Sequence, residues 1–543
     1  MNAVNKLLIA AAAGLLIPVT VIAQSRTTSL AARRCESLLK LTVPSAKVAA
    51  ARLIAPGSYM PPKSEGAVGG AGLYKSLPAF CRVGIISTPS HDSDINIDVW
   101  LPANGWNGRF QAVGNGGFAG YINYRGMAIA IREGFATAST DTGHKGGSTD
   151  AAWALNHPAK VADFGYRAVH EMTAAAKAAI RAFYGNAPRY SYFGSCSNGG
   201  RQALMEVQRY PKDYDGVIAG APANYWTHLL SSALWGEKAM TESPASYIPS
   251  NKIPAIAAAV NAACDRKDGV RDGILNDPRK CHFDPGTMIC KGADSNSCLT
   301  APQATTLKKL YRGAYDSRGQ QVFPGLLPGA EGGDDGWQAW ITGPQLGKSL
   351  MFAFGTGYFA NMVYNRAGWS YRAANFDDAV RMADAKTASL LNATDSNLRP
   401  FESRGGKLVI YHGWNDPAIS PLKTISYYQA MLRALGESDV NSFVRLYMVP
   451  GMQHCEGGPG ADSFGVSGEL VQGDARHDLK TALRDWVEKG TAPGTIIATK
   501  YEASGSRRVE MTRPLCPYPQ AAKYKGSGDT NNAANFACVA GNK

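Results

Sequence analysis

Residues 190–210 read YSYFGSCSNGGRQALMEVQRY, an apolar and aromatic run followed by a run with the composition of a helix. A strand, a tight turn and a helix in this order form a nucleophile elbow, in which the turn exposes the hydroxyl of a serine. Ser197 stands in that turn. Gly199 and Gly200 let neighbouring backbone approach on one side, while Ser195 stands where the usual pattern has glycine. We therefore interpret this stretch as the strand, turn and helix that carry a nucleophile.

Short apolar runs alternate with helix-like runs on both sides of this elbow. This alternation is typical of the α/β class, in which a mostly parallel sheet is covered by helices. The expected strands are 110–113, 135–139, 190–194, 216–220, 408–412 and 443–449, and the expected helices are 162–184, 200–210, 423–435 and 478–489.

The alternation stops between about residues 226 and 399, where cysteines, glycines, aromatic residues and prolines replace it. A stretch of this length is too long for a simple loop. We therefore predict a lid domain at 226–399, inserted into a catalytic domain made of 24–225 and 400–543. With 543 residues and a hydrophobic content of 45%, the chain can bury the large core that this organisation needs.

The loops after two late strands contain the residues needed to activate Ser197. Asp416 follows the strand 408–412, and His454 follows the strand 443–449. In α/β-hydrolases the order along the chain is nucleophile, acid and histidine, with the last two on loops at late strand ends. The sequence therefore predicts that His454 takes the proton of Ser197, which attacks an ester carbonyl, and that Asp416 orients His454.

Other histidines and aspartates fit these roles less well. His412 lies within or just past a strand and His477 leads into a helix, so both are expected to be structural. Asp462 and Asp474 are alternative acids, but both follow the histidine in the chain, against the expected order.

A negatively charged tetrahedral intermediate needs backbone N–H donors. The amide of Asn198, directly after the nucleophile, is one expected donor. The second is expected in the glycine-rich turn 114–118, GNGGF, where we choose Gly117 with Gly116 close behind. A phosphate-binding loop is disfavoured because this turn lacks both the lysine of a P-loop and the dinucleotide-binding spacing.

The first residues have the features of a targeting segment. Lys6 precedes an apolar run at 7–22, and the small-residue site 21–23 precedes Gln24, so we interpret 1–23 as a removed signal peptide. A membrane anchor is the alternative, although the run is short for a bilayer span, and no later segment is apolar enough to cross one. The mature protein is therefore expected to be secreted or periplasmic, and its ten cysteines to pair rather than bind zinc.

The formal charge of +13 does not indicate a nucleic-acid partner. The 56 basic residues are scattered, as in 33–34, 266–267 and 507–508, and they form no block of five or six like charges. A dispersed basic surface is more typical of solubility or of attraction to acidic cell-wall material.

Five segments resemble the tannase and feruloyl esterase family, which also includes hydrolases of aromatic monoesters such as mono(2-hydroxyethyl) terephthalate. They are CSNGGR at 196–201, DTGH at 141–144, HGWND at 412–416, PGMQHC at 450–455 and RPLCPYP at 513–519, and they span nearly the whole mature chain. The resemblance implies an α/β-hydrolase core with a large lid over the active site.

The resemblance also implies a disulfide pattern that spacing alone does not fix. The pairs would be Cys196 with Cys455, Cys35 with Cys81, Cys264 with Cys281, Cys290 with Cys298, and Cys516 with Cys538. Cys196 and Cys455 adjoin Ser197 and His454, so a hydrogen bond between nucleophile and base would carry the two cysteines close enough to bond.

Residues 265–274, DRKDGVRDGI, concentrate carboxylates and glycines between two cysteines of the predicted lid. Hard oxygen ligands on a turning backbone suit calcium, but the spacing is not that of an EF-hand, and a solvated acidic loop is an equal alternative. The resemblance implies a structural Ca²⁺ remote from bond cleavage. Its ligands would be the side chains of Asp265, Asp268 and Asp272 and the carbonyls of Val270 and Ile274.

The predicted lid is rich in aromatic side chains that could sandwich a phenyl ring or pack its core: Trp337, Trp340, Phe352, Phe354, Tyr358, Phe359 and Tyr364. A site that grips a free carboxylate is expected to present arginine, but Lys348 is the only basic residue between 337 and 365. We therefore expect a small aromatic substrate, an ester of a phenolic acid such as a feruloyl or galloyl ester.

Three alternatives stay open. They are a hydrolase of mono(2-hydroxyethyl) terephthalate-type monoesters, a serine peptidase, and a non-catalytic polysaccharide-binding protein on a hydrolase scaffold. The sequence does not indicate the natural ester or the oligomeric state.

Overall fold

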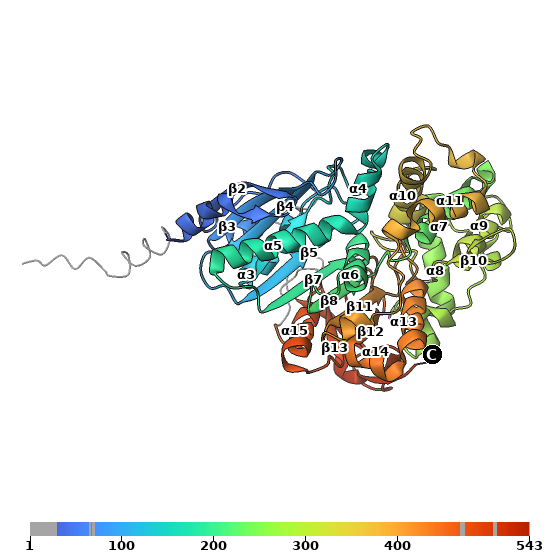
Figure 1. The fold of residues 1–543 in the computed structure, drawn as a ribbon. Helices are drawn as coiled ribbons and strands as arrows, with labels where there is room; N and C mark the ends of the chain where they lie inside the picture. Colours follow the sequence, from blue (N-terminus) through green and yellow to red (C-terminus); the bar gives the residue numbers. More distant parts are fainter. Residues whose placement is uncertain (1–29, 65–66, 68–70, 467–472, 503–507, 542–543) are drawn as a thin grey trace, which may run out of the picture.

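A ten-stranded sheet runs through the computed structural model, which describes residues 30–64, 67, 71–466, 473–502 and 508–541 (Figure 1). The predicted signal peptide at 1–23 lies outside the described residues. The strands of the sheet are β1 (Thr42–Val43), β2 (Ala46–Ile54), β3 (Phe80–Ser87), β4 (Ile95–Pro102), β5 (Arg109–Val113), β6 (Ala136–Thr140), β7 (Tyr190–Cys196), β8 (Gly216–Gly220), β11 (Lys407–Gly413) and β12 (Val444–Val449).

The order of strands across the sheet is β1-β2-β3-β4-β6-β5-β7-β8-β11-β12. The strands from β6 to β12 in this order are parallel, and β1 to β4 form an antiparallel extension that joins β6. The prediction of an α/β fold with a mostly parallel sheet is confirmed. The sequence analysis did not identify the antiparallel extension.

Helices cover both faces of the parallel strands. They are α3 (Tyr124–Arg132), α5 (Ala168–Tyr184), α6 (Asn198–Arg209), α13 (Pro421–Leu435), α14 (Glu437–Phe443) and α15 (Leu479–Lys489), with shorter α2 (Ala71–Lys75), α4 (Pro158–Ala162) and α12 (Arg399–Glu402). A π-helical turn at Asp163–Arg167 leads directly into α5, within the helix expected at 162–184. Helices α5, α6, α13 and α14 pack on one face, and α15 packs on the other.

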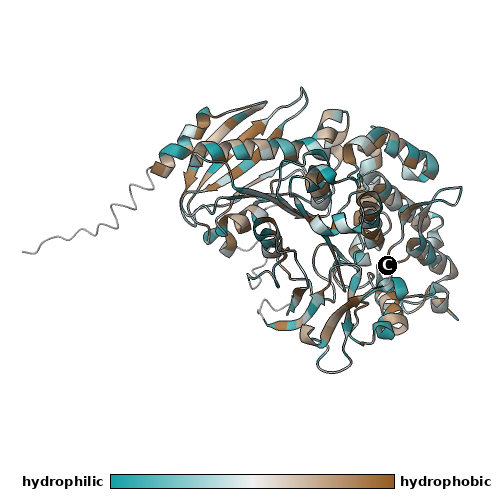
Figure 2. Ribbon diagram, turned by 60° about the horizontal axis from the view of Figure 1, so that its bottom comes forward, coloured by the Kyte–Doolittle hydropathy of each residue, from teal (hydrophilic) through white to brown (hydrophobic). Residues whose placement is uncertain are grey.

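The side chains of the parallel strands alternate between two cores. Val217 of β8 packs with α5 and α6, whereas its neighbour Ile218 packs with α15. Leu408 and Val409 of β11 divide in the same way. Successive side chains of a strand point to opposite faces, so strands buried on both faces appear in the sequence as continuous apolar runs. Figure 2 shows hydrophobic and hydrophilic residues interleaved along the helices that cover the sheet.

The segment between β8 and β11 forms a separate group of helices beside the end of the sheet (Figure 1). It contains α7 (Trp226–Thr241), α8 (Ile253–Cys264), α9 (Ala301–Arg312), α10 (Leu350–Tyr358), α11 (Phe376–Leu391), the hairpin β9 (Gly313–Tyr315) and β10 (Gln321–Pro324), and π-helical turns at Gln338–Thr342 and Phe359–Val363. We call this segment the lid. It packs on the core through a shared cluster that includes Phe118, Phe164, Trp226 and Phe359.

Two further hairpins follow α15. They are formed by β13 (Ile496–Tyr501) with β14 (Val509–Leu515), and by β15 (Gln520–Tyr524) with β16 (Phe536–Ala540). The second packs on the lid, where Phe536 contacts the cluster of Val270. Within the described residues, no helix combines the length and apolar character needed to cross a bilayer.

Five disulfides join all ten cysteines. The pairs are Cys35–Cys81, Cys196–Cys455, Cys264–Cys281, Cys290–Cys298 and Cys516–Cys538, the same pairs that the family resemblance implies. Two of them lie within the lid, and one joins the end of β7 to the loop that follows β12.

Candidate active site

Ser197 lies in a strained turn between β7 and α6. Its φ is +66°, in the left-handed region that side-chain-bearing residues rarely adopt. Its N–H donates to the carbonyl of Gly220 at 2.9 Å, which fixes the turn against β8. A Cβ at Gly200 would lie 2.2 Å from the same carbonyl oxygen, so glycine is required there. This is the geometry of a nucleophile elbow, and the strain is located where chemistry would use it.

The structure brings Ser197, His454 and Asp416 into one hydrogen-bonded line. His454 Nε2 is 2.9 Å from Ser197 Oγ, and His454 Nδ1 is 2.8 Å from Asp416 Oδ2. Asp416 follows β11 and His454 follows β12, both at the edge of the sheet where β7 ends. The arrangement can transfer the serine proton to the imidazole while the carboxylate orients the ring.

Asp416 is fully buried, and both of its carboxylate oxygens accept hydrogen bonds. Its Oδ1 accepts the N–H groups of Ala418 and Ile419 at 2.8 and 2.9 Å. Its Oδ2 also lies 3.0 Å from His412 Nε2. Burial alone would raise the pKa of Asp416, but the charge of His454 and the hydrogen bonds from both histidines lower it below its usual range. The two histidines therefore favour the ionised form of this carboxylate.

His412 has a definite place in this site. The sequence analysis predicted a structural histidine, and the structure puts its buried ring directly on Asp416. Because Nε2 also faces the carbonyl of Ile419 at 3.1 Å, it must carry a proton that it donates to these acceptors. Nδ1 pairs with Thr424 Oγ1 at 2.7 Å. His412 is therefore a positioning residue for Asp416.

The two residues predicted to supply oxyanion donors both lie beside Ser197. Gly117 and Asn198 both line the cavity beside Ser197, and their N–H groups donate to no other described residue. The N–H of Gly116, the alternative considered from the sequence, donates to the hydroxyl of Tyr121 at 3.1 Å. Gly117 has a φ of +54°, and a Cβ there would lie 2.2 Å from the carbonyl oxygen of Ser148.

The glycine-rich turn is linked to the nucleophile helix by Asn115. Its N–H donates to Gln202 Oε1 at 3.2 Å, and its Oδ1 accepts from Gln202 Nε2 at 2.8 Å. Its carbonyl accepts from Asn198 Nδ2 at 3.2 Å. These bonds fix the two amide donors relative to each other, which preorganised electrostatic stabilisation requires.

Arg201 and His144 hydrogen-bond to Asn198 and to the glycine-rich turn, respectively. Arg201 is fully buried and donates to Asn198 Oδ1 at 2.9 Å and to the carbonyl of Gly165 at 2.7 Å. His144 Nε2 lies 2.7 Å from the carbonyl of Phe118, in the glycine-rich turn. Burial lowers the pKa of His144 to about 4, so the ring is neutral and donates this bond. The sequence showed both motifs but not these contacts.

The disulfide Cys196–Cys455 joins the residues next to the nucleophile and the base. The two Cα atoms are 5.9 Å apart, and the residues are separated by 259 positions in the chain. Cys455, like Ser197, has a positive φ, at +70°. The bridge therefore fixes two strained loops to each other across the site.

Ser197 and His454 open into a cavity of about 550 Å³ between core and lid. Trp340 and Phe354 of the lid form an aromatic wall, with rings stacked at a centroid distance of 6.1 Å. The rings of Trp340 and His454 meet in a T-shaped arrangement, with their centroids 5.0 Å apart. Of the other predicted aromatic residues, Trp337, Tyr358 and Phe359 are buried in cores, and Phe352 and Tyr364 pack at the edge of the lid cluster.

The alternative acids and base lie elsewhere. His477 pairs with Asp474 at 2.9 Å, and Asp462 accepts the N–H of Gly457 at 2.7 Å. None of the three lines the cavity.

The acidic turn at 265–274 lies in the lid, beside the disulfide Cys264–Cys281. Asp265 accepts the N–H of Gly273 at 2.9 Å, and Asp268 accepts that of Asn276 at 3.0 Å. Burial, with the charges of Asp272 and Asp265, raises the pKa of Asp268. Carboxylate oxygens are the ligands that calcium prefers, but those of Asp265, Asp268 and Asp272 do not all lie within 4.8 Å of one another in this structure.

Asp272 has a second partner outside the lid. Buried Arg513 of β14 donates to Asp272 Oδ2 at 2.6 Å, which ties the acidic turn to the C-terminal hairpins.

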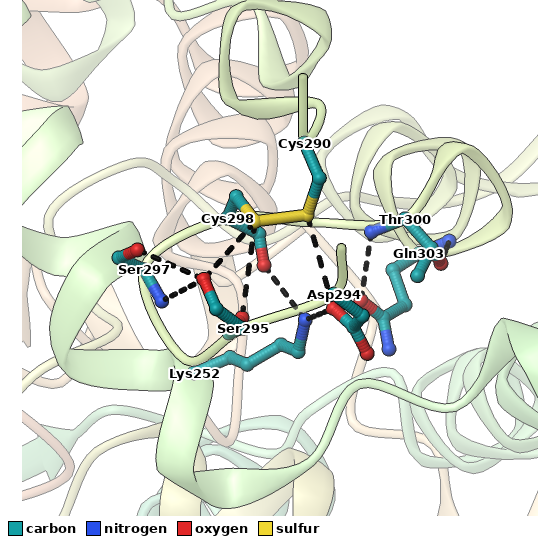
Figure 3. Close-up of a disulfide and its surroundings, with 8 residues drawn as sticks. All are labelled: Lys252, Cys290, Asp294, Ser295, Ser297, Cys298, Thr300 and Gln303. Carbon is teal, nitrogen blue, oxygen red and sulfur yellow. Dashed lines mark hydrogen bonds and ion pairs between the residues drawn. A yellow bond between two sulfur atoms is a disulfide. The ribbon is translucent and has the colours of Figure 1, made fainter. Parts of the chain in front are cut away.

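Two groups of potential metal ligands, both outside this turn, have their ligand atoms clustered among the described residues. In the first, Cys290 and Cys298 are bonded to each other beside Asp294, so neither offers a thiolate (Figure 3). In the second, Glu206 adjoins His170 and Asp213. Burial and the charge of Asp213 raise the pKa of Glu206 well above its usual range.

Comparison with known proteins gives one consistent family. A family model described as "Tannase and feruloyl esterase" matches residues 81–539. The chain is 40% identical to an uncharacterised esterase of Xanthomonas campestris pv. campestris, covering 94% of this chain and 92% of that protein. It is 34% identical to a probable feruloyl esterase B-2 of Aspergillus terreus, covering 84% of this chain and 86% of the relative.

Solved structures agree. Feruloyl esterase B from Aspergillus oryzae superposes with a TM-score of 0.85 at 29% identity, covering 94% of this chain and all of that one. A tannin acyl hydrolase from Aspergillus niger superposes with a TM-score of 0.73 at 23% identity, over 94% of each chain, and shares the fold.

Proposed function

This chain belongs to the tannase and feruloyl esterase family and is a carboxylic ester hydrolase, and we propose that it cleaves esters of phenolic acids through an acyl-enzyme on Ser197. The observation that carries the proposal is that Ser197, His454 and Asp416 are hydrogen-bonded in a line. They lie at the floor of a cavity whose wall is formed by aromatic side chains. The proposed mechanism follows from this geometry.

In the first half-reaction His454 Nε2 takes the proton of Ser197 as Oγ attacks the ester carbonyl. The carbonyl oxygen becomes an oxyanion, and the N–H groups of Gly117 and Asn198 stabilise it. His454 then gives the same proton to the departing alcohol oxygen. The C–O bond breaks, the alcohol leaves, and the acid remains bound as an ester of Ser197.

In the second half-reaction a water enters in place of the alcohol. His454 takes one of its protons as the water oxygen attacks the acyl carbonyl, and a second oxyanion forms in the same place. Collapse of this intermediate releases the aromatic acid, and His454 returns the proton to Ser197 Oγ. Asp416 keeps the imidazole oriented in both halves and stabilises its charged form.

The lining of the cavity supports an aromatic acyl group. Trp340 and Phe354 offer flat apolar faces. Paired aromatic rings gain interaction free energy in addition to the free energy gained by burying apolar surface. Leu229, Leu230 and Ile419 extend the apolar lining. A volume of about 550 Å³ lies within the range of small-ligand sites. A monoester of terephthalate is the second candidate, since it carries the same ring.

The five disulfides support export, because such bonds persist in oxidising compartments. We propose that 1–23 is a signal peptide and that the mature esterase is periplasmic or secreted.

We also propose that the turn at 265–274 binds a structural Ca²⁺. Asp265, Asp268 and Asp272 would supply carboxylate oxygens, and Val270 and Ile274 would supply carbonyls. The bound ion would neutralise the repelling carboxylates of the lid turn and take no part in bond cleavage.

The test combines labelling and turnover. A fluorophosphonate should label the protein but not Ser197→Ala, because it reacts only with an activated serine. Methyl ferulate, methyl gallate, chlorogenate and mono(2-hydroxyethyl) terephthalate should then be compared by kcat/KM, with a matched amide to detect peptidase activity. Preference for the terephthalate ester, or cleavage of the amide at a similar rate, would contradict the proposed substrate class.

A further inference from the structure

One histidine and two acidic residues lie together outside the cavity, between two helices that cover the sheet. His170 belongs to α5, Glu206 to α6, and Asp213 to the loop between α6 and β8. Each offers a ligand atom that lies within 4.8 Å of those of the other two. None of the three lines the cavity beside Ser197, so the proposed ester hydrolysis gives them no role.

Glu206 is the least accessible member of this group. The residue is 1% exposed, and neither of its carboxylate oxygens has a hydrogen-bond partner. The charge of Lys177 lowers the pKa of Glu206, but burial and the charge of Asp213 outweigh it. A buried carboxylate without partners is costly, because it loses its hydration and nothing replaces it. This carboxyl group therefore needs either a proton shared with Asp213 or a bound cation.

The histidine of the group is held in place by its neighbours. The ring of Tyr210 stacks on that of His170, with the centroids 3.9 Å apart and the planes 7° from parallel. His170 Nδ1 lies 2.7 Å from Asp213 Oδ2. Lys177 Nζ donates to the backbone carbonyl of Asp213 and so fixes the loop against α5. The imidazole and both carboxyl groups are thus positioned by packing and hydrogen bonds, as a preorganised metal site requires.

The three side chains supply one imidazole nitrogen and two carboxylate groups. Neutral imidazole and carboxylate oxygens are ligands of Zn²⁺ and of related divalent first-row ions. A divalent ion between Glu206 and Asp213 would offset their repulsion, and His170 in its neutral form would be the nitrogen ligand. The side chains of His170 and Asp213 are 36% and 16% exposed, so an ion can enter from solvent and keep bound water.

We propose that His170, Glu206 and Asp213 bind one divalent transition-metal ion of the Zn²⁺ class. The ion links α5 to α6, the helix that begins directly after Ser197. It therefore stabilises the framework of the nucleophile elbow without contacting the substrate. The proposal depends neither on the identity of the ester nor on calcium binding in the lid.

The test is a calorimetric titration of the metal-stripped protein with Zn²⁺, with saturating Ca²⁺ present to keep Zn²⁺ from the acidic turn at 265–274. One equivalent of Zn²⁺ should bind and raise the melting temperature. Glu206→Gln removes a direct ligand and should weaken binding by at least about a hundredfold, since changes in outer-shell partners already cost about 10-fold to 100-fold. The glutamine amide can donate to Asp213, so without metal this variant should melt no lower than the unaltered protein.

His170→Asn removes the nitrogen ligand at a half-exposed position and should weaken Zn²⁺ binding to a similar extent. His157→Asn is the matched control. His157 Nδ1 lies 2.9 Å from Asp92 Oδ1, and no third clustered ligand joins this pair among the described residues. The control should leave the affinity for Zn²⁺ unchanged.

Absence of Zn²⁺ binding by the unaltered protein would overturn the proposal and leave a shared proton between Glu206 and Asp213. Binding that survives Glu206→Gln or His170→Asn would also overturn it, because the ion would then be held elsewhere. An equal loss of affinity in His157→Asn would do the same. Loss of binding in the two ligand variants alone would support the site, whichever ester the enzyme cleaves.

Discussion

The core and the lid differ in how their chains are held. The parallel strands β5, β7, β8, β11 and β12 are joined by ladder hydrogen bonds, and their ends carry Ser197, Asp416 and His454. The lid has one short hairpin, several 3-10 and π-helical turns and two internal disulfides. The rigid part therefore holds the residues of the proposed triad, while the lid supplies Trp340 and Phe354 to the cavity wall. Because of this division, we expect that the catalytic rate and the choice of substrate can be altered separately.

The largest expected effect is in the core. Ser197→Ala should lower kcat by at least about a thousandfold on methyl ferulate, because no acyl-enzyme can form. The melting temperature should stay close to that of the unaltered protein. Phe354→Leu in the lid should instead raise KM by about tenfold with a small change in kcat, because it removes a ring from the wall and leaves the triad in place.

Stopped-flow and steady-state kinetics on both variants check this division. A large loss of kcat in Phe354→Leu with KM unchanged would show that the lid takes part in the chemical step, and retained kcat in Ser197→Ala would remove the triad assignment.

The second effect compares a disulfide of the core with one of the lid. Cys196–Cys455 closes 259 residues, and Cys290–Cys298 closes 8. The chain-entropy relation assigns roughly 5.5 kcal/mol to the first loop and roughly 2.5 kcal/mol to the second. Replacing both cysteines by alanine should therefore lower the free energy of unfolding more for the first pair.

Activity should separate these two variants further. Loss of the bridge between the Ser197 and His454 loops should lower kcat at a temperature where the protein is folded, since a displacement of about 1 Å can cost on the order of a hundredfold. The lid variant should keep its kcat. Equal losses of activity would show that Cys196–Cys455 only stabilises the chain.

The sequence predicted the parallel core well for a physical reason. β8 is buried along its whole length, and its apolar run gave the same bounds as the structure, Gly216–Gly220. β2 was not identified. Its register shifts between Val48 and Ala50, so its buried positions do not alternate with a period of two.

The candidate site likewise contains some contacts that the sequence predicted and others that it did not. The order of Ser197, Asp416 and His454 was sufficient to predict their meeting, because each follows a strand that ends at one edge. The contact of His412 with Asp416 depends on the turn that brings Ile419 back to the ring. The ion pair of Arg513 with Asp272 joins residues 241 positions apart, and no local sequence pattern predicts it.

The third expected effect is on the stability of the lid. If the turn at 265–274 holds Ca²⁺, chelation with EGTA should lower the melting temperature, and saturating calcium at about 100 times Kd should contribute about 2.7 kcal/mol. Asp268→Asn should reduce the calcium-dependent shift. The reaction of Ser197 with fluorophosphonate should persist below the melting transition. Metal analysis that finds no calcium, with no effect of EGTA on melting, would contradict the site.

The last effect is a pH dependence shared by the two regions. Burial raises the pKa of Asp141 in the core to about 7, despite hydrogen bonds from Gly143 and Asn96. Burial likewise raises the pKa of Glu331 in the lid to about 7, where it accepts from Tyr311 Oη at 2.5 Å. Both values lie above those of the unfolded chain, near 4.

The sign follows from proton linkage. A carboxyl group whose pKa is raised by folding binds its proton more tightly in the folded state, so its stabilising contribution is complete below about pH 4. That contribution is lost as the pH rises toward and through 7. Asp141→Asn and Glu331→Gln mimic the protonated forms, so each variant should lose less stability than the unaltered protein between pH 5 and pH 8.

Urea denaturation at these two pH values checks the expectation, with the double variant as the sharpest case. If only Asp141→Asn flattens the profile, the linked proton lies in the core. If only Glu331→Gln does so, it lies in the lid. A profile unchanged in the double variant would show that neither buried carboxyl group releases its proton in this range, and that other groups determine the pH dependence of unfolding.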